Sequence, residues 1–159
     1  MGSNNDISLK ALAKINLGLD VVRRREDGYH EVRMIMQTIH LYDRLDIKRT
    51  KEPGIQIQTN LSFLPVNENN LIYKAAKLLM DEFSITDGVS VKLDKRIPVA
   101  AGMAGGSTDA AAMLIGVNRL FSLGLTKKTA YGKRCADRCG CTILYYERHG
   151  AGRGHRRGA

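Results

Sequence analysis

Apolar and polar residues alternate along the first part of the chain as they do in a β-strand. Over residues 9–21 every odd position is apolar, from Leu9 to Val21, and most even positions are polar, Lys14 and Asn16 among them. Successive side chains of a strand point to opposite faces. The pattern therefore predicts a strand with one face for a core, and with Lys14 and Asn16 on a second face open to solvent or a ligand.

Shorter patterns further along predict more strands and two helices. Strands are expected at residues 32–41 and 45–48, at Ile55–Thr59 and at residues 89–93. A helix is expected after Asn69 and Asn70, which can cap it, because the apolar residues that follow fall on one helical face. A second helix is expected to reach residue 121. Strands with interspersed helices and tight turns indicate an α+β domain.

Charge is distributed unevenly along the 159 residues, whose formal net charge is +9. Residues 1–126 carry 16 Lys and Arg against 14 Asp and Glu, a net charge of +2, whereas residues 127–159 carry 9 against 2, a net charge of +7. All three cysteines also lie in residues 127–159. We therefore expect one folded domain in residues 1–126 and a basic Cys/Arg/Gly-rich tail in residues 127–159. The balanced charge of the domain argues against nucleic acid as its partner.

Hydropathy gives no sign of a membrane segment. No apolar run approaches the roughly 20 residues that cross a bilayer, and the first residues lack the basic-then-apolar pattern of a secretory signal. The sequence predicts a cytoplasmic protein without a membrane partner.

The glycine-rich stretch at residues 98–108 carries the clearest chemical signal. Gly102, Gly105 and Gly106 fall within five positions, and Ser107 or Thr108 can cap the alanine-rich helix that follows. A loop of this kind presents free N–H groups at the positive end of a helix dipole, which suits phosphate. No lysine follows the last glycine, as it would in a Walker A loop, and the spacing is not that of a dinucleotide-binding loop. Alone, the stretch predicts either an anion site or a purely structural turn.

Several segments in order carry a resemblance to a known family. The glycine-rich stretch resembles the second signature motif of the GHMP kinase superfamily (galacto-, homoserine, mevalonate and phosphomevalonate kinases). Four more segments agree with one branch of it: Ala13-Lys14-Ile15-Asn16-Leu17, Arg25-Glu26-Asp27-Gly28-Tyr29-His30-Glu31, Asn70-Leu71-Ile72-Tyr73 and Lys95-Arg96-Ile97-Pro98. The resemblance covers residues 7–126. It implies the N-terminal ATP-binding α+β domain of a GHMP kinase (ribosomal protein S5 domain 2-like), incomplete and without the C-terminal GHMP domain.

The resemblance also implies an activity and its reactants. That branch phosphorylates the 2-hydroxyl of a cytidine-diphosphate-linked methylerythritol with ATP and Mg²⁺, a step of non-mevalonate isoprenoid (terpenoid) biosynthesis. Lys14 is the implied catalytic residue, beside the reacting hydroxyl, where a cation stabilises the charge of the transferring phosphoryl group. Asn16, Tyr29 and His30 are the implied substrate-binding residues, because an amide can hydrogen-bond hydroxyls while a ring and an imidazole can hold a base.

The resemblance assigns ATP binding to the glycine-rich stretch and to two residues outside it. Ser107 is in addition the implied Mg²⁺ ligand. From the residues alone plainer readings remain open, since Lys14 can be an exposed strand lysine, Asn70 a helix cap and Lys95 a solvated turn residue. The implied ATP-binding residues are Pro98, Val99, Ala100, Ala101, Gly102, Met103, Ala104, Gly105, Gly106, Ser107, Thr108, Asn70 and Lys95.

Beyond Thr126 the sequence departs from the family pattern. The family continues into a Gly-Ala-Asp-Val-Pro motif whose Asp is the catalytic base, and residues 127–159 contain no such motif. Codons can be chosen for these residues that restore the motif when read one base later, so we expect a single-base frameshift after the codon of Thr126. The polypeptide is then expected to have little or no activity.

Other readings of the tail and of the whole chain stay open. The cysteines of the tail, with His149 or His155, could bind zinc, although C-x3-C-x-C is a poor match to the usual spacings. Its Arg and Gly residues could bind RNA without sequence preference. For the whole chain the alternatives are another GHMP small-molecule kinase, such as a homoserine kinase, and a non-enzymatic basic nucleic-acid-binding module.

Overall fold

The computed structural model describes residues 5–26 and 28–125. The tail of residues 127–159, with its expected frameshift and its zinc and RNA alternatives, lies outside the described residues, as does Asp27. The described part contains β1 (Asp6–Arg24), β2 (His30–Thr50), β3 (Ile55–Thr59), α1 (Leu71–Glu82), β4 (Gly88–Asp94) and α2 (Gly105–Leu120). The α+β prediction is confirmed. None of its helices is long and apolar enough to cross a membrane.

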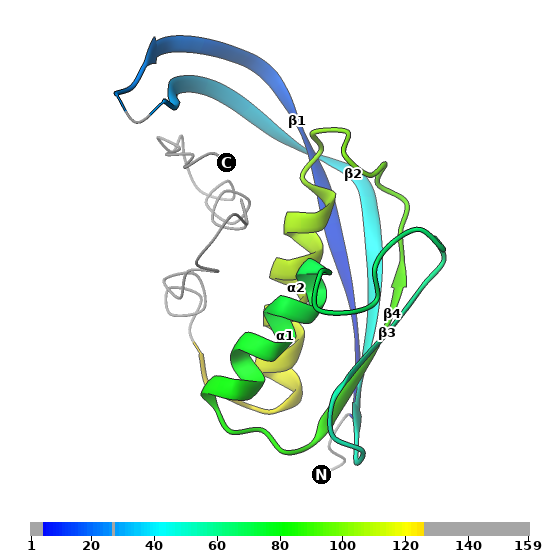
Figure 1. Ribbon diagram of the computed structural model, residues 1–159. Coiled ribbons are helices and arrows are strands. Elements are labelled where there is room, and N and C mark those ends of the chain that lie inside the picture. The colour runs from blue at the N-terminus through cyan, green and yellow to red at the C-terminus, as the bar shows by residue number, and fades with distance from the viewer. Residues whose placement is uncertain (1–4, 27, 126–159) are drawn as a thin grey trace.

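The strands form one sheet in the order β1-β2-β4-β3. β1 pairs with β2 and β2 with β4 in antiparallel fashion, whereas β3 and β4 are parallel and are connected through α1. Parallel neighbours need such a crossover, because a tight turn can only reverse the chain. Both helices lie against the same face of the sheet and pack on each other, so the domain has two layers (Figure 1).

The core lies between these layers. The inward faces of the strands contribute alternate residues, and each helix contributes a buried stripe, as period-2 and period-3.6 patterns require. α2 approaches β2 closely at Gly116, where a Cβ would lie 2.2 Å from Ile47 Cδ1. The most deeply buried apolar residues are Ala13, Leu45, Ile47, Val89, Val91, Ile72, Ala75, Ala76, Leu79, Ile97, Ala110, Met113 and Val117.

Most predicted elements are present, with longer strands than expected. The expected strands at residues 32–41 and 45–48 are one continuous strand, β2, and the expected strand at residues 9–21 lies within β1. The predicted strand at Ile55–Thr59 has the bounds of β3. α1 begins after Asn70 as predicted, and the Asn70 side chain accepts a hydrogen bond from the Ile72 N–H at 2.9 Å.

The outer halves of β1 and β2 form an arm that extends beyond the helices and curves toward their side of the sheet (Figure 1). The predicted core face of residues 9–21 is wrong here, because Leu17, Leu19 and Val21 are 63%, 50% and 59% exposed. Neither α1 nor α2 covers this stretch. The expectation that Lys14 lies on an open face is also wrong: Lys14 is 2% exposed. The pairing of β1 with β2 shifts between Leu12 and Lys14, and this irregularity interrupts the alternation.

The start of α2 also differs from the prediction. Neither Ser107 nor Thr108 caps it; the helix begins at Gly105, after Ala104, which has the left-handed φ of 63° and forms no side-chain cap. Thr108 lies inside the first turn, where its hydroxyl donates to the Gly105 carbonyl at 2.9 Å and to the Ala104 carbonyl at 3.1 Å. The Thr108 hydroxyl, which was expected to accept from a backbone N–H as a cap, therefore donates to backbone carbonyls of its own helix instead.

Candidate functional site

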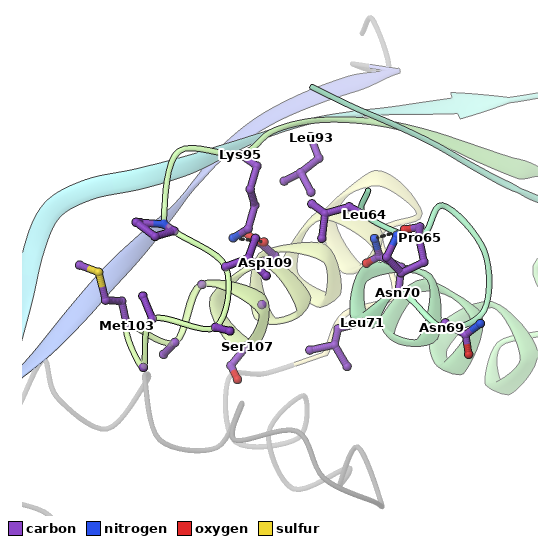
Figure 2. Close-up of a pocket in the computed structure, with 18 residues that line it drawn as sticks. Leu64, Pro65, Asn69, Asn70, Leu71, Leu93, Lys95, Met103, Ser107 and Asp109 are labelled. Carbon is purple, nitrogen blue, oxygen red and sulfur yellow. Dashed lines mark hydrogen bonds and ion pairs between the residues drawn. The ribbon is translucent and has the colours of Figure 1, made fainter. Parts of the chain in front are cut away.

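A cavity of about 390 Å³ lies between the glycine-rich loop and the start of α1. Every loop residue from Pro98 to Ser107 lines it, as do Asn70 and Lys95. Thr108 does not line it, because its side chain is turned back onto the carbonyls of its own helix. The predicted ATP-binding residues therefore lie together around one space, with Thr108 as the exception. Figure 2 shows Met103 and Ser107 on one side of this space and Asn70 on the other.

The loop backbone has the conformation of an anion cradle. Ala100, Gly102 and Ala104 have positive φ values of 61°, 70° and 63°, whereas the residues between them do not. Alternation of this kind turns successive N–H groups toward one side and makes anion-binding concavities. Left-handed alanine is unfavourable by roughly 1–2 kcal/mol, and such strain gathers at ligand sites.

The N-terminus of α2 adds to this cradle. The first N–H groups of a helix have no partner within it and carry the positive end of its dipole. Here they belong to Gly105, Gly106 and Ser107, all of which line the cavity. Residues of the loop and of the helix N-terminus thus border one cavity, a combination suited to a phosphate group.

Asn70 is held by both ends of its side chain. Its Oδ1 accepts from the Ile72 N–H, and its Nδ2 donates to the Pro65 carbonyl at 2.7 Å. In this structure the Asn70 side chain therefore acts as the N-cap of α1. The same contacts fix the segment with Leu64 and Pro65, which forms the apolar wall of the cavity opposite the loop.

Lys95 is buried, so the solvated-turn reading is wrong for it. Its Nζ contacts Asp43 Oδ2 and lies 2.9 Å from Asp109 Oδ2, and all three side chains are almost fully buried. Asp43 Oδ1 in turn accepts from the N–H groups of Arg96 and Ile97. Asn60 holds the Lys95 backbone, accepting from its N–H at 2.8 Å and donating to its carbonyl at 3.0 Å. This cluster connects β2, the entry of the loop and the N-terminal part of α2.

Within this cluster, the pKa of Asp109 differs strongly from that of a free carboxyl group. The pKa of Asp109 is raised to about 7, chiefly because burial removes water from its carboxylate. The attraction of Lys95 opposes this rise, while the nearby Asp43 carboxylate adds to it. Desolvation outweighs the attraction of Lys95. Asp109 also lines the cavity, and its Oδ1 has no hydrogen-bond partner among the described residues.

Lys14 and Asn16 lie beside the loop, outside the cavity lining. The Lys14 N–H donates to the Met103 carbonyl at 3.1 Å, which holds β1 against the loop where the arm leaves the sheet. Lys14 Nζ donates to Asn16 Oδ1 at 3.2 Å. The structure therefore brings the predicted catalytic lysine and Asn16 into contact with each other and next to the predicted ATP-binding loop.

Tyr29 and His30 lie elsewhere, at the turn that joins β1 to β2 at the far end of the arm (Figure 1). The turn is closed by hydrogen bonds from the Arg25 N–H to the Tyr29 carbonyl at 2.6 Å and from the Gly28 N–H to the Arg25 carbonyl at 3.1 Å. Gly28 has a φ of 83°, which favours glycine at this position. Neither Tyr29 nor His30 lines the cavity, so the structure does not bring them together with the loop.

The described residues contain no group of three or more His, Cys, Asp or Glu side chains that could hold a metal ion. Magnesium in nucleotide sites rarely has such an all-protein cage, since phosphate oxygens and water supply most of its ligands. The Ser107 hydroxyl, at the α2 end of the cradle, is compatible with a bound Mg²⁺ of that kind.

Sequence reasoning missed Asp43 and Asp109, although the periodicity contains a signal for both. Asp43 is two residues before Leu45 on the strand face that also carries Ile47, and Asp109 is one helical turn before Met113 on the buried stripe of α2. A carboxylate at an inward position must be paired or functional, because an unpaired buried charge is very unfavourable. The missing information was the partner, Lys95, which is distant from both in sequence.

Comparison with known proteins places these features in a family. Residues 70–140 match the model of the GHMP kinases N terminal domain. The chain is 66% identical over 115 residues to the 4-diphosphocytidyl-2-C-methyl-D-erythritol kinase of Lachnoclostridium phytofermentans, covering 72% of the chain and 40% of the relative. It is 52% identical over 122 residues to the Alkaliphilus metalliredigens protein of that name, covering 77% and 42%. The chain thus spans about two fifths of the length of these relatives.

Solved structures agree with the sequence matches. A crystal structure of 4-(cytidine 5'-diphospho)-2C-methyl-D-erythritol kinase superposes with a TM-score of 0.67 at 38% identity, covering 76% of this chain and 42% of the other. The homoserine kinase of Cytophaga hutchinsonii superposes with a TM-score of 0.65 at 17% identity over 83% of this chain and 40% of the other, a likeness of fold. By sequence and by fold, the chain belongs to the GHMP kinases and contains their N-terminal domain.

Proposed function

We propose that the cavity binds ATP, with the triphosphate against the N–H groups of residues 99–107. The observation that carries this proposal is the convergence of the left-handed loop residues and the α2 N-terminus on one cavity. The apolar wall with Leu64 and Pro65 suits a purine ring, since such rings bind against apolar side chains. Mg²⁺ would be held by phosphate oxygens and by the Ser107 hydroxyl.

The proposed reaction of the whole protein is phosphorylation of 4-diphosphocytidyl-2-C-methyl-D-erythritol, in isoprenoid biosynthesis. Support comes from relatives of that name at 52–66% identity. The substrate hydroxyl oxygen forms a bond to the γ-phosphorus of ATP, the bond to the β,γ-bridging oxygen breaks, ADP leaves and the hydroxyl proton passes to a base. Lys14, held beside the loop through Met103, supplies a cation for the transferring group. Mg²⁺ neutralises phosphate charge when bound.

Tyr29 and His30 are proposed to bind the cytidine end of the substrate, and Asn16 its hydroxyls. Tyr29 and His30 do not line the cavity proposed for ATP, as expected of residues that bind the cytidine end of the substrate and not the transferred phosphoryl group. A homoserine kinase would have no use for this pair. A substrate panel separates the two possibilities: we expect phosphorylation of the cytidine-linked substrate and none of homoserine by a protein with the complete active site.

The polypeptide of 159 residues is proposed to have little or no turnover of its own. The family resemblance assigns the base to a Gly-Ala-Asp-Val-Pro motif, which residues 127–159 do not contain. We propose that a one-base shift after the codon of Thr126 explains this. Sequencing the gene tests it directly, and a protein read in the restored frame should gain activity. Clear turnover by the homogeneous 159-residue chain would contradict the proposed inactivity.

ATP binding is tested by titration calorimetry on the purified chain with Mg²⁺ present. The proposal predicts saturable binding of one ATP per chain, and lost binding in a Gly105→Ala variant whose fold is intact by circular dichroism. The basic tail could attract ATP without any site, so the matched control is Gly18→Ala in the arm, which should bind like the unaltered chain. Equal binding by both variants would show that the cavity is not the site.

A further inference from the structure

Asp43, a fully buried residue of β2, uses both of its carboxylate oxygens next to the glycine-rich loop. Its Oδ1 accepts from the N–H of Arg96 at 2.5 Å and from the N–H of Ile97 at 2.8 Å, the two residues that lead into the loop. Its Oδ2 contacts the Nζ of Lys95. Hydrogen bonds to a charged acceptor are shorter and stronger than those between neutral groups. The first oxygen therefore fixes the place where the loop begins.

The second oxygen is connected to the other end of the loop through Lys95. The Lys95 Nζ that contacts Asp43 also lies 2.9 Å from Asp109 Oδ2, in the N-terminal part of α2. The same Nζ lies 2.6 Å from the place of a Cβ on Gly105, the first residue of that helix. Figure 2 shows the Lys95 side chain extending toward Asp109. One carboxylate is thus joined to the residues before the loop and, through one lysine, to the helix after it.

The backbone between these two ends has a conformation that needs support. Ala100 and Ala104 have φ values of 61° and 63°, in the left-handed region that alanine avoids. Such conformations persist where the surrounding structure determines them. Between the two ends, the Lys14 N–H donates to the Met103 carbonyl at 3.1 Å and so joins the loop to β1. The ends themselves are fixed by the contacts of Asp43.

We propose that Asp43 is a positioning residue for the phosphate site, which holds residues 98–104 in the nucleotide-binding conformation by fixing both ends of the loop, the far end through Lys95. The inference rests on the proposed ATP binding and adds a residue outside the cavity on which the affinity depends. Asp43 does not touch the nucleotide itself, because it is fully buried and does not line the cavity. A ligand that needs one conformation loses affinity in proportion to the molecules that no longer adopt it.

Asp43→Asn tests this role with little change in side-chain size. Whichever way the amide turns, its NH₂ group faces donors, so either the N–H groups before the loop or Lys95 lose their acceptor. Removal of a negative charge near a phosphate site would by itself tighten ATP binding. The positioning role predicts the opposite, ATP binding that is weaker by about tenfold to a hundredfold. The direction of the change therefore separates position from charge.

Calorimetric titrations with Mg²⁺ compare ATP with adenosine, on variants whose fold is intact by circular dichroism. Asp43→Asn should weaken ATP binding and leave adenosine binding within about twofold of the unaltered chain, because adenosine has no phosphate for the loop to hold. The matched control is Asp46→Asn, three residues further along β2 and so on its other face, where Asp46 pairs with Arg44 at 3.0 Å. This control should bind ATP like the unaltered chain.

A second variant keeps the proposal falsifiable should Asp43→Asn not fold. Asn60→Ala frees the Lys95 backbone, which Asn60 holds by two hydrogen bonds, and changes no charge. It should weaken ATP binding in the same direction. ATP binding in the folded variant that equals or exceeds that of the unaltered chain would overturn the positioning role, and so would equal losses for ATP and adenosine. Failure of the unaltered chain to bind ATP would instead overturn ATP binding and this inference together.

Discussion

The cavity and the arm belong to the same domain, yet they differ in the number of elements that contribute residues to each and in how firmly those residues are held. At the cavity, residues from the loop, α1 and the end of β4 come together and are held by a buried charge cluster. At the arm, Tyr29 and His30 lie on a two-stranded extension whose apolar residues Leu19 and Val21 are about half exposed. The comparison shows that the described domain assembles the proposed nucleotide site from several elements, whereas the residues proposed for the other substrate lie together on one hairpin.

Among the changes near the cavity, removal of the Asp43 side chain should lower the free energy of unfolding most. Asp43→Ala leaves Lys95 with one carboxylate and removes the acceptor for the Arg96 and Ile97 N–H groups. Breaking a buried pair in this way lowers the free energy of unfolding by about 3–5 kcal/mol, a large part of the stability of a small domain. Urea denaturation measures the loss. The exposed pair of Asp81 and Lys77 is the control, and Asp81→Ala should cost less than about 1 kcal/mol.

Asp109 should make the stability of the domain depend on pH. Its pKa is about 7 in the folded state, against 3.8 for the free side chain. Between these values the folded state binds more protons than the unfolded state, so the free energy of unfolding falls as pH rises from about 4 to about 7. The fall attributable to Asp109 is on the order of a few kcal/mol. Asp109→Asn should flatten the pH profile of urea denaturation, and an unchanged profile would contradict this role.

Two glycines give a matched test of close packing in the two regions. A Cβ on Gly105 would lie 2.6 Å from Lys95 Nζ and 3.0 Å from Ile97 Cγ2, and Lys95 cannot move aside without leaving its carboxylates. Gly105→Ala should therefore lower the free energy of unfolding by about 1–3 kcal/mol. In the arm, Gly18 has no atom within 4 Å of its Cβ position. Gly18→Ala should be neutral or slightly stabilising by thermal unfolding, since glycine is flexible in the unfolded chain.

Substitutions on the exposed surface of the arm should change the free energy of unfolding least. Val21→Thr changes a side chain that is 59% exposed and should shift the free energy of unfolding by no more than about 0.5 kcal/mol. Val91→Thr makes the same change at a fully buried position of β4, where an unsatisfied hydroxyl costs about 1–3 kcal/mol. Comparable losses for both variants in urea denaturation would mean that the arm is packed as tightly as the core.

Sequence patterns predicted the element types well, because alternation and helical spacing are local properties. Ile55–Thr59 and the Asn70 cap were predicted at their observed places. The exposure of Leu17 and the burial of Lys14 could not be predicted, since they depend on where the helices end above the sheet and on an irregularity of pairing between β1 and β2. Periodicity describes the faces of a strand and leaves open what covers them.

The candidate site was predicted where one continuous segment forms it and missed where distant residues meet. The glycine-rich loop was recognisable from its own residues, and residues 98–107 do line a single cavity with Asn70 and Lys95. The left-handed conformations of Ala100 and Ala104 were not readable, because alanine usually avoids them. Asp43 and Asp109 needed the fold, since Lys95 unites residues from β2 and α2 that no local pattern relates.

The central claim, that the loop cavity holds the nucleotide, is tested most directly by amide chemical shifts of the isotope-labelled chain during titration with ATP and Mg²⁺. We predict saturating shifts that are concentrated at residues 99–107 and at the start of α1 around Asn70, with the arm turn at Gly28 and Tyr29 unchanged. Shifts confined to the basic residues 127–159, or spread evenly over the domain, would contradict the account.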